Sequence, residues 1–305
     1  MPSITALRHP GLDAPSGIIA AFGEVWFTNI GADNVGRVRD GRIEVFDTPP
    51  GSGIRFPANI FPGADGRVWF TSLGSDALAA MDPAAMDPSS TLTVYPLPEN
   101  SRPVALKSGS DGRLWFSLRG TDSIGSIDPL AADPSASLSV LTGPEVAGPA
   151  ALFVAADASV WWVNSGSGTI GGHHPATGAM TIVDSPPCSP RAWAQTPDGM
   201  LWLTTREPAG LLSFDPRDPA DTVRHVSDPV LVEPDGVCTA VDGSLWLVDS
   251  ATDSVVRYAP GGDWQRFGAA PDVAGPFDIK PGPDPTVLWF TNKTGNSIGQ
   301  VSADL

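Results

Sequence analysis

The sequence predicts an all-β fold, a seven-bladed β-propeller with four antiparallel strands in each blade. One observation is a tryptophan-centred apolar segment that recurs at Trp26, Trp69, Trp115, Trp161, Trp202, Trp246 and Trp289. The six intervals between these tryptophans average roughly 44 residues, which is the length of a propeller blade. A second observation is that Gly, Asp and Pro separate apolar runs too short to bury both of their faces alone, so neighbouring units must stack.

Each unit contains four predicted strands in a fixed order. The first is a short apolar run such as residues 17–20, and in several units an Asp-Gly turn such as Asp111-Gly112 follows it. Asp-Gly between alternating hydrophobic residues is a strong hairpin signal. The tryptophan strand comes second, a strand such as residues 34–38 third, and a strand such as residues 43–46 fourth. Because the tryptophans hold the same place in every unit, we expect them to pack between neighbouring sheets.

The two ends of the chain predict how the last blade is completed. Its first three strands are residues 277–280, 287–291 and 297–301, and the sequence then ends at Leu305 without a fourth. Residues 4–8 show the alternation of a fourth strand and precede the first strand of the first unit. This N-terminal strand is therefore predicted to join the last blade, which closes the ring and hides two sheet edges.

We predict one domain over residues 1–305. Its seven blades have approximate boundaries at 10–48, 49–97, 98–142, 143–185, 186–227, 228–268, and 269–305 together with 3–9.

Composition narrows the classes of partner. Lys and Arg total 18 against 34 for Asp and Glu, so the net charge of −16 repels polyanions, and we expect neither nucleic acid nor a membrane surface as a partner. No apolar stretch has the length of a membrane span, and residues 1–17 lack a signal-peptide pattern, which predicts a cytoplasmic protein. Cys188 and Cys238 are too few for a disulfide framework and are expected to be buried free thiols.

The direction of the predicted strands indicates which residues could form a binding site. The start of each first strand and the end of each second strand lie on one face of a propeller, where the loops between blades also open. The residue after each opening proline, or its equivalent, is Ser16, Ala58, Val104, Ala150, Arg191, Asp235 or Phe277. Small apolar residues on one side and polar residues from blades five to seven on the other resemble a small-molecule pocket, although a protein partner on this face is a second option.

We assign hypothetical roles to the polar members of this set. Asp235 is the candidate general base, Arg191 the group that stabilises developing negative charge, and Asp249 a group that assists or binds a metal. The candidate substrate-binding residues are Ser16, Trp193, Glu233, Phe277 and Asn292. The alternative is that Arg191 and Asp235 form an ion pair between blades five and six. The cofactor is not identified, and magnesium among Glu233, Asp235 and Asp249 remains open.

The repeat motif resembles the streptogramin lyase family, also called the virginiamycin B lyases. The closest matches are Asp111 to Phe116, and Trp289 to Asn292 followed by Asn296 to Gly299. The resemblance covers essentially the whole chain and implies a propeller that eliminates at the ester bond of a cyclic depsipeptide antibiotic with a magnesium ion. It also implies histidines after the opening prolines of blades six and seven, where this chain has Asp235 and Phe277.

Three functional hypotheses remain. The favoured one is a diverged carbon–oxygen lyase that acts on a cyclic peptide, lactone or related natural product, because a polar cluster survives where the family keeps its site. The second is a noncatalytic propeller that binds a small molecule or a protein partner. The third is a metal-dependent lactone or ester hydrolase, since other propellers use a central calcium for that reaction.

Overall fold

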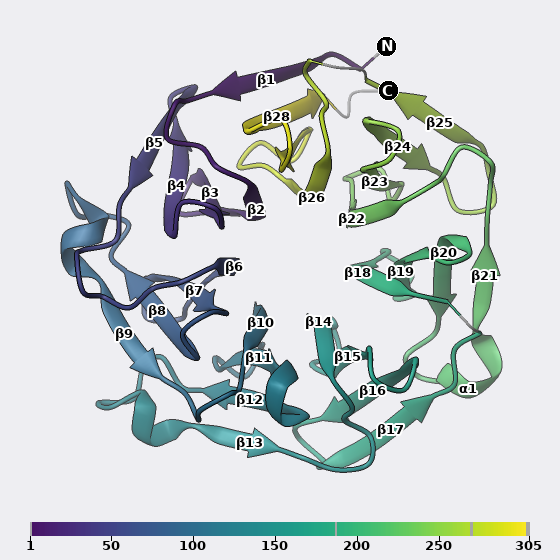
Figure 1. Ribbon diagram of the computed structural model, residues 1–305. Helices are drawn as coiled ribbons and strands as arrows, with labels where there is room; N and C mark the ends of the chain where they lie inside the picture. Colours follow the sequence, from purple (N-terminus) through teal and green to yellow (C-terminus); the bar gives the residue numbers. More distant parts are fainter. Residues whose placement is uncertain (1, 187, 269–270, 303–305) are drawn as a thin grey trace. The chain divides into compact units, whose positions relative to one another are not determined.

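The seven predicted blades are present as seven separate four-stranded sheets. The computed structural model describes residues 2–186, 188–268 and 271–302, and within these ranges the strands run from β1 to β28. Each sheet contains four strands that pair in antiparallel fashion (Figure 1). The chain is a seven-bladed β-propeller, and this confirms the predicted fold class.

The chain divides into two compact units. One comprises residues 1–27, 37–44 and 185–305, and the other comprises residues 28–36 and 45–184. The sheet β2–β3–β4–β5 is formed by β2 (Pro15–Ala21), β3 (Glu24–Asn29), β4 (Asn34–Arg39) and β5 (Arg42–Phe46).

Three sheets belong to the unit that contains the candidate site. One has β18 (Pro190–Gln195), β19 (Leu201–Arg206), β20 (Ala209–Phe214) and β21 (Arg224–Val226). The next has β22 (Pro234–Thr239), β23 (Leu245–Asp249), β24 (Ser254–Tyr258) and β25 (Trp264–Phe267). The last has β26 (Pro276–Pro281), β27 (Val287–Asn292), β28 (Ser297–Ser302) and β1 (Ile4–Arg8).

Three further sheets lie in the other unit. They consist of β6 (Pro57–Pro62), β7 (Val68–Ser72), β8 (Ala77–Met81) and β9 (Thr93–Pro96); β10 (Pro103–Ser108), β11 (Leu114–Leu118), β12 (Ser123–Ile127) and β13 (Ser139–Leu141); and β14 (Pro149–Val154), β15 (Val160–Asn164), β16 (Thr169–His174) and β17 (Ala179–Val183).

Helices are limited to single turns. They are Pro88–Thr91, Arg119–Thr121, Ser135–Ser137 and α1 (Pro219–Thr222) in the described part of the chain. None of the helices in the described residues is long and apolar enough to cross a membrane.

The N-terminal strand completes the last sheet, as predicted. β1 runs antiparallel to β28, with Ile4 opposite Val301 and Arg8 opposite Ser297. In Figure 1 the purple β1 lies beside the yellow β28. The first residues of the chain thus cover an edge that the last sheet would otherwise leave unpaired.

Tryptophans of the second strands pack in the core, as predicted. Trp246 is fully buried and stacks on Phe267, with ring centroids 5.5 Å apart. Trp202 of β19 meets Tyr258 of the following sheet edge-on at 5.9 Å, and both belong to one apolar cluster with Val237 and Leu247. These large side chains supply much of the apolar area that joins consecutive sheets.

The first strand of a sheet carries a β-bulge directly after its opening proline. The pairing register shifts between Pro190 and Trp193 in β18 and between Pro234 and Val237 in β22. The same shift occurs between Pro276 and Ile279 in β26. A bulge bends a strand and redirects the side chains within it. The sequence therefore places its variable polar residues at positions where the backbone departs from regular pleating.

A threonine hydroxyl ties the bulge of β22 to the preceding sheet, and another ties the start of β2 to the last sheet. Thr204 of β19 donates to the main-chain carbonyl of Asp235, and Thr291 of β27 donates to that of Ser16 at 2.7 Å. These bonds join β19 to β22 and β27 to β2. Because the acceptor is the main chain, the link does not depend on which side chain the bulge carries.

Candidate functional site

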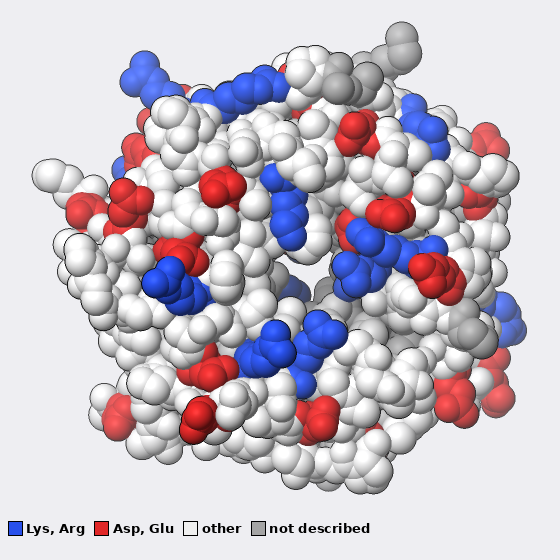
Figure 2. Space-filling view, viewed as in Figure 1, with Lys and Arg blue, Asp and Glu red and all other residues white. Residues whose placement is uncertain are grey.

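Charged side chains gather around the bulges of β18 and β22. Arg191 lies in the first bulge and Asp235 in the second, and Arg206 ends the intervening strand β19. Figure 2 shows basic and acidic side chains next to one another over β18 and β22. The sequence-predicted neighbours Arg191, Glu233, Asp235 and Phe277 thus come from adjacent strands of one compact unit.

Asp235 is the buried centre of this charged group. Its carboxylate is only 4% exposed, and Arg206 Nη2 donates to its Oδ2 at 2.6 Å. Arg191 Nε lies 3.6 Å from its Oδ1. The ion pair between Arg191 and Asp235 that was the alternative interpretation is therefore present. Both carboxylate oxygens already face a guanidinium, so Asp235 is suited to fixing the arginines rather than to accepting a proton from a substrate.

Glu233 lies at the exposed rim of the group. Its Oε2 is 3.5 Å from Arg206 Nη1 and accepts a hydrogen bond from Ser250 Oγ at 3.4 Å. Its side chain is half exposed, so this pairing adds little stability.

Lys293 is a third cation in the group and follows β27 directly. Its Nζ lies 4.5 Å from the centre of the Phe277 ring, a cation–π arrangement. Burial lowers the pKa of the Lys293 ammonium group below its ordinary value. The carboxylate of Asp235 opposes this shift, and the positive charges of Arg191 and Arg206 add to it. Phe277, predicted as a substrate-binding residue, forms the apolar floor beneath this amine.

Asp249 is fully buried and bound by the backbone of its own sheet. Its Oδ2 accepts hydrogen bonds from the amides of Val232 at 2.7 Å and Glu233 at 3.0 Å. Its Oδ1 accepts from the amide and hydroxyl of Thr252. With four donors already in place, Asp249 fixes the loop before β22, and this position argues against the catalytic or metal-binding role predicted for it.

Asn292 fixes the corresponding loop of the last sheet. Its Oδ1 accepts from the amide of Ala274 at 3.0 Å, and its Nδ2 donates to the carbonyl of Asp272 and to Ser297 Oγ, each at 2.9 Å. Asn164 does the same in its own sheet, where it bonds Ala147 and Glu145. The end of the second strand is thus a loop-fixing position, and Asn292 has no free polar atom directed at a ligand.

Replacing Asn292 with alanine should lower the free energy of unfolding by about 2 kcal/mol, because the buried Asn292 side chain makes three hydrogen bonds that are lost. Urea denaturation followed by tryptophan fluorescence measures this change. The exposed Gln265→Ala in β25 is the control and should change stability little. Equal stability of the two variants would contradict the loop-fixing role.

Ser16 and Trp193 are both buried. Ser16 is buried and uses its carbonyl to accept from Thr291. Trp193 is buried as well, and its ring meets Phe214 of the same sheet edge-on at 6.2 Å. Trp193 therefore packs within its sheet, and neither residue has the exposed surface that the predicted substrate contact requires.

The residues present do not fit the magnesium ion that the family resemblance implies. Asp235 pairs with two arginines, Glu233 pairs with Arg206, and Asp249 is occupied by four protein donors. Among the described residues no group of three or more His, Cys, Asp or Glu side chains is arranged to hold a metal. Magnesium needs free oxygen ligands, whereas this site presents guanidinium and ammonium groups.

Sequence reasoning did not identify Arg206 and Lys293. Each comes one residue after the position taken as the end of a second strand, Thr205 or Asn292. That next position was interpreted as the start of a turn. A cation stands at this place in three sheets, as Arg119, Arg206 and Lys293, and two of these three belong to the charged group.

The chain shares its repeat with one described family. Residues 13–181 match the family model described as the Virginiamycin B lyase family. The matched range ends before β18, so the charged group lies outside it. Comparison with curated proteins finds no match.

Solved structures with the same fold include lyases of this kind. A streptogramin B lyase is 21% identical with a TM-score of 0.85, and the match covers 99% of this chain and 97% of that one. A catalytically inactive virginiamycin B lyase from Staphylococcus aureus with quinupristin is 19% identical with a TM-score of 0.86, covering 99% of each chain. YCF48 with a bound peptide is 16% identical with a TM-score of 0.75, covering 99% and 97%. At these identities the likeness shows the fold.

Proposed function

The chain belongs to the virginiamycin B lyase family, and on that premise we propose that it is a lyase-like enzyme that opens a cyclic peptide or lactone. The proposed site is the charged group of Arg191, Arg206, Asp235 and Lys293. One observation carries the proposal, namely that three cationic side chains surround a single buried carboxylate beside the Phe277 ring. Such a group attracts the carbonyl and carboxylate oxygens of an ester.

Lys293 is the proposed general base. An elimination at an ester requires a base that removes the proton from the carbon next to the carbon–oxygen bond. Lowering the pKa of a lysine by burial increases the fraction of neutral amine, and only the neutral amine accepts a proton. The centre of the Phe277 ring lies 4.5 Å from the Lys293 nitrogen, and the ring helps to hold it in place.

Arg191 is the proposed partner of the leaving group. Lys293 takes the proton, and the electron pair of the broken carbon–hydrogen bond forms the new carbon–carbon double bond. The electron pair of the carbon–oxygen bond leaves with the carboxylate. The Arg191 side chain is 43% exposed and can therefore face a ligand while its Nε remains near Asp235. A guanidinium stabilises the negative charge that develops on the departing oxygens.

Asp235 has a positioning role in this scheme. It holds Arg206 at 2.6 Å and Arg191 at 3.6 Å, which keeps three like charges within one small region. Without that carboxylate the cations would repel one another. This assignment replaces the earlier hypothesis that Asp235 is itself the base.

The experiment is a ring-opening assay with quinupristin and a panel of macrolactones, each with and without added magnesium. Mass spectrometry separates the reactions, because elimination leaves the mass of the opened ring unchanged whereas hydrolysis adds one water. Arg191→Gln should lower turnover roughly a hundredfold, since it removes the group that stabilises the leaving oxygens. The exposed Arg217→Gln is the matched control and should retain activity.

Three results would contradict the proposal. Failure to open every ring tested would remove the enzymatic assignment. A product that gains one water would favour hydrolysis. Turnover that depends strictly on magnesium would conflict with the cationic character of the site.

A further inference from the structure

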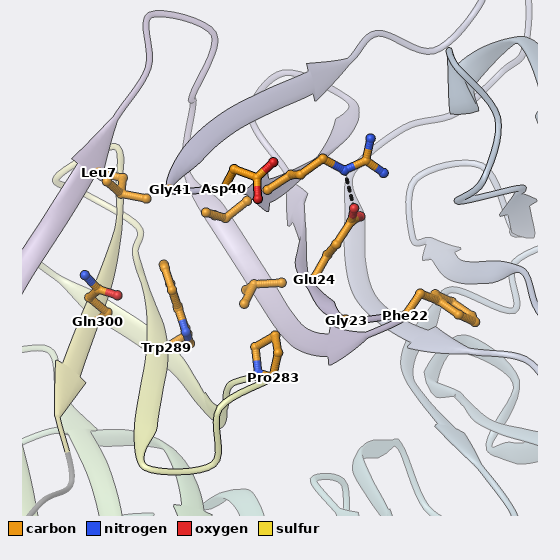
Figure 3. Close-up of a pocket in the computed structure, with 12 residues that line it drawn as sticks. Leu7, Phe22, Gly23, Glu24, Asp40, Gly41, Pro283, Trp289 and Gln300 are labelled. Carbon is orange, nitrogen blue, oxygen red and sulfur yellow. Dashed lines mark hydrogen bonds and ion pairs between the residues drawn. The ribbon is translucent and has the colours of Figure 1, made fainter.

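A cavity is lined by residues other than those of the charged group. It is a groove of about 590 Å³ between the last sheet and the hairpins of β2 to β5. Its residues come from β1, β27, β28 and the turn before β27 on one side, and from the turn residues Phe22 and Gly23, β3, β4 and the turn after β4 on the other (Figure 3). This volume is within the range of small-molecule sites.

Trp289 on the wall of this groove differs from five of the six other recurring tryptophans. In five other sheets the indole N–H of the recurring tryptophan donates to a side chain of the neighbouring turn. These pairs are Trp69 with Asp65, Trp115 with Asp111, Trp161 with Ser159, Trp202 with Thr196, and Trp246 with Ser244. For Trp289 no acceptor lies within hydrogen-bond distance among the described residues. Its indole N–H is therefore left for a ligand or for water.

The turn before β27 explains this difference. It contains Pro283 and Pro285, and its carboxylate, Asp284, accepts from the amide of Thr286 at 3.0 Å and from its hydroxyl at 2.7 Å. Asp284 lies five residues before Trp289, whereas Asp65 and Asp111 lie four residues before Trp69 and Trp115, so this turn is one residue longer. Gly282 lets the ring lie against the turn, because a Cβ there would be 2.6 Å from the indole nitrogen.

The opposite wall holds a charge network that is satisfied internally. Glu24 accepts from Arg39 Nε through Oε1, and its Oε2 lies 3.4 Å from Nη1 of the buried Arg37. Arg37 also bonds Glu44 at 2.6 Å. These pairs fix the wall and leave no strong net charge to attract an ion.

Two other polar side chains around the groove, the Gln300 amide and the Asp40 carboxylate, can form hydrogen bonds with a ligand. Gln300 donates to Thr5 Oγ1 at 2.9 Å, which orients its amide and leaves the carbonyl oxygen as an acceptor. Asp40 contributes a rim carboxylate at a turn position with φ of 50°. In Figure 3, Gln300 and Trp289 line one side, Asp40 and Glu24 the other, and Phe22 lies at one end. Phe22 is 46% exposed.

We propose that this groove binds a neutral sugar of one or two rings. A sugar hydroxyl both donates and accepts, so it can use the Trp289 N–H together with the Gln300 carbonyl and the Asp40 carboxylate. The C–H faces of a sugar ring pack on indole and phenyl rings, which Trp289 and Phe22 provide. An anionic ligand is disfavoured by the net charge of −16.

Ligand-observed NMR followed by calorimetry tests the proposal with the full chain. The probes are a panel of neutral mono- and disaccharides at millimolar concentration. Trp289→Phe keeps an aromatic face and removes only the N–H, and it should weaken sugar binding roughly three- to tenfold. Gln300→Ala and Asp40→Asn should each produce a similar loss, and asparagine suits the positive φ at position 40.

Controls separate this groove from the proposed lyase site. Arg191→Gln should leave sugar binding unchanged, and Trp289→Phe should leave ring-opening turnover unchanged. Thermal melting of each variant establishes that the fold is intact. The proposal is overturned if no sugar binds at 20 mM, a concentration roughly at the weak limit of such sites. It is also overturned if a sugar binds all the groove variants as tightly as the parent chain.

Discussion

Replacing Gly236 with alanine should lower the free energy of unfolding by about 3 kcal/mol. Gly236 lies in the bulge of β22, where a Cβ would be 2.6 Å from the Cα of Asp278 and 2.8 Å from the carbonyl oxygen of Phe277. Both are main-chain atoms of β26. Because a backbone cannot rotate away as a side chain can, the two strands must separate, and the packing between their sheets is lost.

Chemical denaturation compares this variant with Gly262→Ala. Position 262 lies in the turn before β25, where the nearest atom to a new Cβ is the Cβ of Ala259 at 3.3 Å. That contact relaxes with a small shift, so the control should lose well under 1 kcal/mol. If the two variants unfold at the same denaturant concentration, the close approach of β22 and β26 is not what requires glycine at position 236.

Replacing Lys293 with methionine should reduce ring-opening turnover by about two to four orders of magnitude, the usual contribution of a general base. Methionine retains an unbranched apolar side chain over Phe277, so the packing beneath the site is largely conserved. Steady-state kinetics on whichever ring the parent chain opens fastest measures the effect. A variant that keeps a tenth or more of the parent activity would exclude Lys293 as the base.

The pH dependence provides a readout that a structural role would not change. The folded-state pKa of Lys293 is lowered, and the neutral amine is the active form. The parent kcat/KM should therefore rise with pH, with the midpoint of the rise below the ordinary lysine value of about 10.4. The residual activity of Lys293→Met should lack this rise. Identical profiles for both proteins would assign the ionisation to another group.

The repeat predicted the architecture because each sheet repeats one local pattern. The tryptophan strand, the turn before it and the N-terminal strand were all recognisable, and β1 pairs with β28 accordingly. Period-two patterning determines which residues are buried in a regular strand. Sheet order then follows from the tendency of consecutive strands to pair.

The site was only partly predictable because it is built on bulges and strand ends. Arg191 and Asp235 were correctly expected to be neighbours, since both follow an opening proline. Asp249 and Asn292 were expected to face a ligand, yet both turn inward to bind loop amides. Sequence cannot distinguish a carboxylate that caps a loop from one that faces a cavity, because both follow the same strand. Arg206 was missed because its long side chain acts one position beyond the strand end assumed.

The threonine bonds to main-chain carbonyls have an evolutionary consequence. Thr204 and Thr291 secure adjacent sheets through atoms that every amino acid possesses. Mutation at the adjoining side chains can therefore exchange one reactive group for another without loosening the scaffold. A different side chain at position 235 could therefore be exchanged for Asp235 while the chain still folds, so that new substrates are reached in small steps.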